Sequence, residues 1–143
     1  MKVADIIDAK GKEVVSIDAH SSVEDAIRLM NSSGISALIV KEKGSTAGIF
    51  TERDVVRCYL ASEGKSFKEM PLKDAMTPDL VVAEMEDDLS EIMSIMVEKN
   101  IRHIPVIAKE KIIGMLSSRD IIQIHVNKMT TEIHYLRDYI TSI

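Results

Sequence analysis

The sequence contains two heptapeptides of the same design, GIFTERD at residues 48–54 and GMLSSRD at residues 114–120. Each has a glycine, two apolar residues, a hydroxyl residue, a variable residue, an arginine and an aspartate. The hydroxyl residue and the aspartate are three positions apart, as in a capping box, where both side chains satisfy free backbone groups at a helix start. Both heptapeptides therefore predict a turn from a strand into a helix.

The same residue types could also hold a phosphorylated ligand. The free N–H groups and the dipole at a helix N-terminus favour an anion, and arginine adds a charged fork for phosphate oxygens. An aspartate can accept hydrogen bonds from ribose hydroxyls. Capping alone accounts for one copy, whereas the duplication and the arginine in both copies favour ligand binding. Both interpretations stay open on the motif alone.

The heptapeptides belong to a tandem repeat with an offset of 66 residues, which holds without a gap from Val14 to Arg57. Each copy predicts a strand, an amphipathic helix, a β-hairpin and a second helix. In the first copy we expect Ser21 and Glu24 to cap the first helix and Gly34 to end it. In the second copy Asp87 or Asp88 caps the helix and Asn100 replaces the glycine. The segments VADII (3–7) and LKDAM (72–76) are predicted to be equivalent lead-in turns.

With this order of elements, the sequence from about Val3 to His125 resembles a pair of CBS domains. The resemblance implies an α+β fold of tandem βαββα repeats with pseudo-two-fold symmetry, here with an extended C-terminal helix. The expected divisions are repeat one with its lead-in over 1–64, repeat two with its lead-in over 65–127, and a helical extension over 128–143.

The resemblance also implies that the cleft between the two repeats binds an adenosine-containing regulatory ligand such as AMP, ADP, ATP or NAD. By position, an aspartate of each repeat would hold the ribose, and a hydroxyl residue would meet phosphate with an arginine nearby. Apolar residues would flank the adenine. The residues so assigned are Asp54 and Asp120 for the ribose; Thr51, Ser117, Arg53 and Arg119 for the phosphate; and Val15, Ala37, Val81 and Ile104 for the adenine.

The two copies differ at the start of the hairpin. Arg102 and His103 of the second copy match a basic pattern of the family and would contact phosphate, whereas Ser36 and Ala37 hold these positions in the first copy. We therefore expect the site around Asp120 to be the better anion binder.

Composition excludes several other functions. The formal net charge of −5 disfavours nonspecific nucleic-acid binding. The sequence has no long apolar run, no secretory signal pattern, no P-loop and no histidine pair with metal-ligand spacing. A single cysteine, Cys58, lies among apolar helical residues. We expect a soluble, cytoplasmic protein without a metal site, a catalytic cofactor or enzyme activity.

The last 23 residues, from Ile121 on, contain neither glycine nor proline and carry an apolar heptad stripe. One set of its members (Val126, Ile133 and Ile140) is all β-branched and the other holds Met129 and Leu136, the pattern that favours a parallel two-stranded coiled coil, although a helix folded back on its own domain would look similar. Stripe members are Ile122, Val126, Met129, Ile133, Leu136, Ile140 and Ile143.

Together with these residues, the resemblance implies a stand-alone regulatory module that senses an adenine nucleotide and signals to an unknown partner protein, most simply as a homodimer. The alternative is a structural or interaction module that dimerises without binding nucleotide and uses both motifs only as helix caps.

Overall fold

The computed structural model describes residues 1–63 and 66–141 and contains two compact units. One unit comprises residues 14–81, and the other comprises residues 1–13 together with 82–143. The expected boundary between residues 64 and 65 lies outside the described residues. By this division, residues 1–13 belong to the unit that holds the second repeat, and the segment before the second repeat, up to residue 81, belongs to the unit that holds the first.

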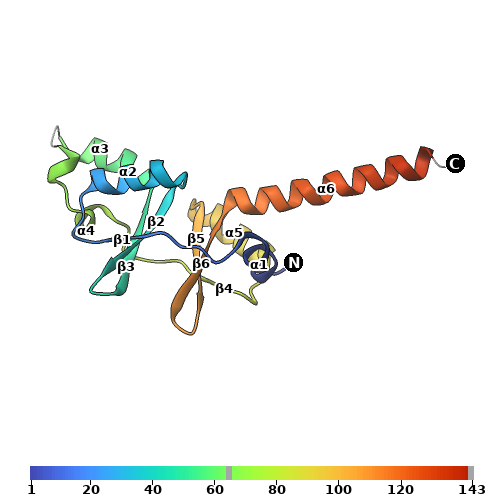
Figure 1. Cartoon of the computed structure of the whole chain (residues 1–143), viewed down its shortest axis with the longest axis horizontal. Helices are drawn as coiled ribbons and strands as arrows, with labels where there is room; N and C mark the ends of the chain where they lie inside the picture. Colours follow the sequence, from blue (N-terminus) through green and yellow to red (C-terminus); the bar gives the residue numbers. More distant parts are fainter. Residues whose placement is uncertain (64–65, 142–143) are drawn as a thin grey trace. The chain divides into compact units, whose positions relative to one another are not determined.

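Within the first repeat, a three-stranded sheet carries two helices that pack against each other on one of its faces (Figure 1). The lead-in to the second repeat adds a 3-10 helix, η1, and a one-turn α-helix to this unit. The elements are β1 (Ser16–Asp18), α2 (Val23–Ser33), β2 (Ala37–Glu42), β3 (Ser45–Thr51), α3 (Glu52–Ala61), η1 (Phe67–Glu69) and α4 (Leu72–Ala75).

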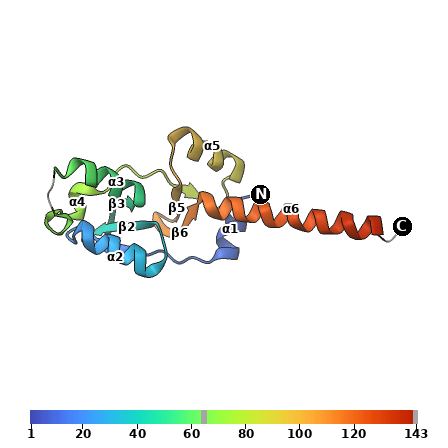
Figure 2. The ribbon, with the colours of Figure 1, turned by 90° about the horizontal axis from the view of Figure 1, so that it is seen from above.

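The second repeat has the same order of elements, preceded by an N-terminal helix and ending in a much longer last helix. The elements are α1 (Val3–Lys10), β4 (Ala83–Glu84), α5 (Leu89–Lys99), β5 (His103–Ala108), β6 (Lys111–Ser117) and α6 (Ser118–Thr141). Figure 2 shows α6 continuing as a single rod past α1 and α5. No helix among residues 1–63 and 66–141 has the length and the apolar character needed to cross a bilayer.

The two sheets repeat each other pair for pair at the offset of 66. Leu38 pairs with Phe50 as Ile104 pairs with Leu116, and both hairpins shift register at the same place, after Val40 and after Val106. One difference has a chemical cause. The N–H of Ile39 donates to the carbonyl of Val15, but Pro105 holds the position of Ile39 in the second repeat. Since proline has no N–H, β4 begins one position later in the repeat than β1.

The core of the first repeat forms where the helices cover the sheet. Val23, Ala26 and Met30 lie on one face of the amphipathic helix α2, at spacings of three and four residues, and all three are buried. They pack with Leu38, Val40 and Phe50 of the strands and with Leu72 and Ala75 of α4. The lead-in of the second repeat thus supplies part of the core of the first.

The helix ends agree with the predicted pattern, with one correction. Gly34 and Asn100 both adopt the left-handed conformation that ends α2 and α5, and Asp88 caps α5. The expected cap of α2 by Ser21 and Glu24 was wrong by one residue, because Ser22 and Asp25 form the capping box. The carbonyl of Ser21 instead accepts a hydrogen bond from the N–H of Leu72.

Both lead-ins make the same backbone contacts, each with the other repeat. The N–H groups of Leu72 and Lys73 donate to the carbonyls of Ser21 and Ala19. Those of Val3 and Ala4 donate to the carbonyls of Asp87 and Met85, which occupy the equivalent positions of the second repeat. These contacts confirm the predicted equivalence of VADII and LKDAM, but the prediction that both are turns was wrong, because they form the helices α1 and α4. The contacts also show that each lead-in packs on the repeat other than the one it precedes: residues 3–7 on the second repeat and residues 72–76 on the first.

A glycine on the second strand of each hairpin, Gly48 on β3 and Gly114 on β6, allows close packing of the lead-in or of the residue after it. A Cβ on Gly48 would lie 2.6 Å from the carbonyl oxygen of Thr77 and 2.9 Å from the sulfur of Met76. A Cβ on Gly114 would meet only the side chain of Ile7, at 3.2 Å. The closer contact arises because Thr77 exchanges two backbone hydrogen bonds with Ile49, beside Gly48.

Substituting these glycines should therefore have unequal effects. We expect Gly48→Ala to destabilise the protein by about 1–3 kcal/mol, because the backbone of Thr77 would have to move. Gly114→Ala should cost less, because the Ile7 side chain can change rotamer. Urea unfolding of the two variants beside the wild type measures the difference. An equal or reversed order would contradict the close packing of residues 76–77 on β3.

Candidate functional site

Each predicted motif lies where the last strand of a hairpin turns into a helix. The backbone N–H of Thr51 donates to Oδ2 of Asp54 at 2.9 Å, and the N–H of Ser117 donates to Oδ2 of Asp120 at 3.0 Å. The hydroxyl of Ser117 accepts a hydrogen bond from the N–H of Asp120 in return. Capping geometry is thus present in both copies, as the spacing predicted.

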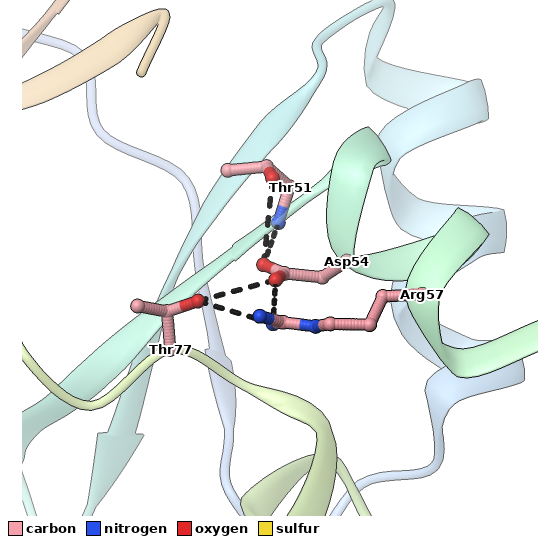
Figure 3. Close-up of polar contacts among 4 residues, drawn as sticks. All are labelled: Thr51, Asp54, Arg57 and Thr77. Atoms are coloured by element: carbon pink, nitrogen blue, oxygen red, sulfur yellow. Dashed lines mark hydrogen bonds and ion pairs between the residues drawn. The ribbon is translucent and has the colours of Figure 1, made fainter. Parts of the chain in front are cut away.

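The carboxylate of Asp54 is enclosed by groups from three segments (Figure 3). Its Oδ2 accepts the Thr51 N–H, and its Oδ1 accepts the Thr77 hydroxyl at 3.1 Å and forms an ion pair with the Arg57 guanidinium. Arg57 also donates to the Thr77 hydroxyl at 3.3 Å. As a result, only 6% of the Asp54 side chain is exposed.

Asp120 has a different cationic partner. Nζ of Lys10, at the end of α1, donates to Oδ2 of Asp120 at 2.6 Å and to the carbonyl of Met115 at 2.5 Å. The Asp120 side chain keeps 26% of its surface exposed. Lys10 and Asp120 are 110 residues apart in the chain, so this ion pair exists only because α1 packs on β6 and α6.

Two opposing effects act on the pKa of Asp120. Partial burial removes water from the carboxylate and would raise its pKa. The hydrogen bonds from Lys10 and Ser117 and the positive charge of Lys10 favour the ionised form more strongly. The pKa of Asp120 therefore lies below its ordinary value, and the group is a carboxylate at neutral pH.

The other predicted residues of the first repeat gather around the same turn. Ala37, at the start of β2, pairs with Thr51, and the carbonyl of Ser36 accepts the N–H of Glu52. Val15 is half-buried against the core of this unit. Arg53 lies exposed on α3. Ser36, Ala37, Thr51 and Asp54 are thus brought together.

The second repeat repeats this arrangement with larger side chains. His103 pairs with Ser117, and the carbonyl of Arg102 accepts the N–H of Ser118. Arg102 and Arg119 are exposed and His103 is half-buried. Ile104 is fully buried, as is its counterpart Leu38, so it offers no surface to an adenine in this conformation. Val81 is half-buried at the end of the other compact unit.

Sequence reasoning missed the cations and the hydroxyl that contact the aspartates. Arg57 stands three residues after Asp54, a helical spacing that could have indicated an ion pair. Its counterpart at the repeat offset is Gln123, which carries no charge. No local pattern pointed to Lys10 or Thr77. Each follows a lead-in segment closely in the chain and reaches its aspartate because that segment packs on the other repeat.

A cavity of about 410 Å³ lies beside the Asp54 cluster, within the unit of the first repeat. Arg57 and Cys58 of α3 line it, together with Asp74, Thr77 and Pro78 of the lead-in. Its volume is typical of ligand pockets, but neither Thr51 nor Asp54 is part of its lining. Burial and, less strongly, the charge of Asp54 raise the pKa of the Cys58 thiol, which disfavours the reactive thiolate.

Among the residues that the structure describes, no cluster of three or more His, Cys, Asp or Glu side chains could hold a metal ion.

Comparison with known proteins places both motifs in a described family. The family model named CBS domain matches residues 3–61 and 72–127. The chain is 32% identical over 96% of its length to the mitochondrial CBS domain-containing protein CBSX3 of Arabidopsis thaliana and spans 71% of that protein. It spans 59% of a relative from Methanopyrus kandleri, to which it is 31% identical over 81% of its own length.

Solved structures show the same fold. The CBS-domain containing protein ATU1752 from Agrobacterium tumefaciens superposes with a TM-score of 0.81 at 30% identity, covering 85% of this chain and 91% of that one. The CBS domain pair of protein MJ0100, solved with 5'-methylthioadenosine and S-adenosyl-L-methionine, superposes with a TM-score of 0.76 over 87% of this chain and 99% of that one. At 20% identity, this second likeness concerns the fold.

The Lys10–Asp120 ion pair predicts a pH effect. In Lys10→Met the pKa of Asp120 should rise, because burial is then opposed only by Ser117. The stabilisation that the ion pair contributes is present above the ordinary aspartate pKa of about 3.9. It should disappear as the pH falls through the lower pKa of the folded protein. Carboxyl-carbon NMR titration of Asp120 measures the shift.

Lys12→Met, a nearby change of the same kind, serves as the control and should leave that titration unchanged. An identical Asp120 titration in Lys10→Met and the wild type would contradict the ion pair.

Proposed function

The chain belongs to the CBS domain family, and we propose that it is a non-catalytic regulatory module that binds an adenosine-containing ligand of the AMP, ADP, ATP or NAD type. A change in ligand occupancy would be read by a partner protein. The observation that carries this proposal is the ionised, partly exposed Asp120 carboxylate at the start of α6, beside Ser117, Arg102 and His103.

This arrangement matches the chemistry of a nucleotide. A carboxylate beside a helix N-terminus can accept hydrogen bonds from the two ribose hydroxyls, while the hydroxyl of Ser117 and the exposed guanidiniums of Arg102 and Arg119 can reach phosphate oxygens. Adenosine is also the chemical group shared by the two ligands of the MJ0100 domain pair. At 20% identity that protein supports the choice of ligand class and not the choice of ligand.

The two repeats should differ in affinity. The Asp54 side chain is 6% exposed and both of its oxygens are engaged by Thr51, Thr77 and Arg57, whereas 26% of the Asp120 side chain is exposed. A ribose would have to displace Thr77 or Arg57 to reach Asp54. We therefore assign the tighter site to Asp120, in agreement with the preference that Arg102 and His103 suggested.

Lys10 gives the Asp120 site a means to signal. A ribose that approaches Oδ2 of Asp120 competes with the Lys10 ammonium, and a phosphate attracts the same ammonium. In both cases the end of α1 responds, and residue 13, where the chain leaves this unit, follows three residues later. Ligand binding is thereby linked to the segment that joins the two units.

A second candidate is an interaction module without a nucleotide. It is favoured by one observation: capping, the Arg57 ion pair and the Thr77 hydroxyl together account for the contacts of both Asp54 oxygens, with no need for a ligand. A cytoplasmic location remains a prediction in either case.

Ligand binding separates the candidates. We expect at least one of AMP, ADP, ATP, NAD and S-adenosylmethionine to raise the melting temperature of the wild-type protein by mass action. Asp120→Asn should weaken its dissociation constant about tenfold or more, since a hydrogen bond to a charged group contributes about 1.5–3 kcal/mol. Thermal shift identifies the ligand, and isothermal titration calorimetry measures the affinity.

Asp54→Asn is the matched control, because it makes the same chemical change at the enclosed site and should have the smaller effect on affinity. GTP tests base selectivity. If no adenosine compound binds, or if Asp120→Asn binds as tightly as the wild type, the sensor proposal fails at this site and the interaction module remains.

A further inference from the structure

The helix α6 leaves the folded part of its unit soon after the Asp120 motif. Ile121 is its last buried residue, and all described residues from His125 to Thr141 are exposed. The helix nevertheless carries a continuous apolar stripe, with exposed fractions between 43% for Val126 and 69% for Ile140. In this structure the helix therefore does not fold back on its own unit, which was the alternative interpretation of the stripe.

The stripe has the spacing of a coiled coil. Val126, Ile133 and Ile140 occupy one heptad position, a, and Ile122, Met129 and Leu136 occupy the other, d. All three a residues are β-branched, and two of the three d residues, Met129 and Leu136, are not; β-branched residues at a with leucine at d favour two parallel strands. Ile143 would continue position d but lies outside the described residues.

A helix of this kind is marginal unless something covers it. Isolated helices shorter than about 12–15 residues are marginal in water even when rich in alanine, and most helix stability in proteins comes from packing of an apolar face. The part of α6 beyond His125 has no buried residue, so its apolar stripe needs a partner outside its own unit.

The charges beside the stripe identify that partner. In a parallel, in-register pair, position g of one helix faces position e five residues later in the other. Glu132 occupies g and Arg137 occupies e, so two copies of α6 would form two symmetric Glu132–Arg137 ion pairs. Within one helix these residues are roughly 140° apart around the axis, at roughly 100° per residue, and do not face each other.

An antiparallel pair lacks this complementarity. There position g faces g and position e faces e, so Glu132 would lie near His125, Tyr139 or its own copy rather than near Arg137. The charges thus agree with the branching pattern in favouring a parallel arrangement.

We propose that residues 122–140 of α6 pair with the same segment of a second copy of this chain as a parallel, in-register two-stranded coiled coil. The stripe supplies the buried seam and Glu132 and Arg137 set the register. This pairing does not depend on nucleotide binding, so it can fail or succeed independently of the proposed function.

Self-cross-linking of introduced cysteines tests the geometry directly. Met129→Cys and Leu136→Cys, each in a Cys58→Ala background of the full chain, should form disulfide-linked dimers on mild oxidation, because the parallel register brings each position opposite its own copy. An antiparallel pair can bring at most one position opposite itself. Cross-linking at only one position, or at neither, would therefore overturn the proposal.

A core variant with a matched control tests the seam. Ile133→Asp, added to the Leu136→Cys protein, should abolish the cross-link because it buries a charge at position a. Thr131→Asp introduces the same charge on the opposite face of α6 and should leave the cross-link intact. Equal cross-linking in both would contradict pairing through the stripe. Circular dichroism confirms that each variant is folded.

Charge exchange tests the register. Arg137→Glu and Glu132→Arg should each weaken dimerisation roughly tenfold by placing like charges opposite each other, and the double variant should recover most of the loss. The dissociation constant is measured by sedimentation equilibrium at low salt, where surface ion pairs are least screened. Unchanged single variants, or a double variant weaker than either single one, would overturn the assigned register.

Discussion

The exchange of lead-ins is the constraint on which both sites depend. Each repeat forms a sheet and two helices, but part of the surface of each is completed by the segment that precedes the other repeat. The same backbone hydrogen bonds fix both lead-ins, from Leu72 to Ser21 and from Val3 to Asp87. Because the chain runs from one unit into the other and back again, the unit of residues 14–81 is contiguous, whereas the other unit is assembled from residues 1–13 and 82–143.

This exchange also determines the electrostatics of the two aspartates. Thr77 reaches Asp54 from one lead-in, and Lys10 reaches Asp120 from the other. Equivalent capping motifs therefore acquire different surroundings. Asp54 is enclosed by Thr77 and by a cation of its own helix, whereas Asp120 pairs with a distant lysine and keeps part of its surface exposed. A duplicated sequence has thus produced two sites of unequal accessibility, which is consistent with one binding site and one structural site.

The last helices of the repeats share an exposed apolar face and differ mainly in length. Val56 and Leu60 of α3 are exposed, as are Ile122 and Val126, their counterparts in α6. The helix α3 ends at Ala61, whereas α6 continues to Thr141. Only α6 is long enough to carry the apolar stripe over several heptads. The repeat thus supplies the first residues of an exposed apolar face in both helices, and the added length of α6 makes that face suited to a coiled coil.

The sequence alone determined the local structure of this protein. The hairpins, the left-handed helix ends at Gly34 and Asn100, the capping of both motifs and the equivalence of the lead-ins follow from residue type and spacing over short distances, and all are present in the structure. The tertiary structure alone decided which repeat each lead-in completes and that Lys10 is the cation that meets Asp120. Lys10 and Asp120 are 110 residues apart, and periodicity carries no information about such a contact because it depends on how packed elements meet.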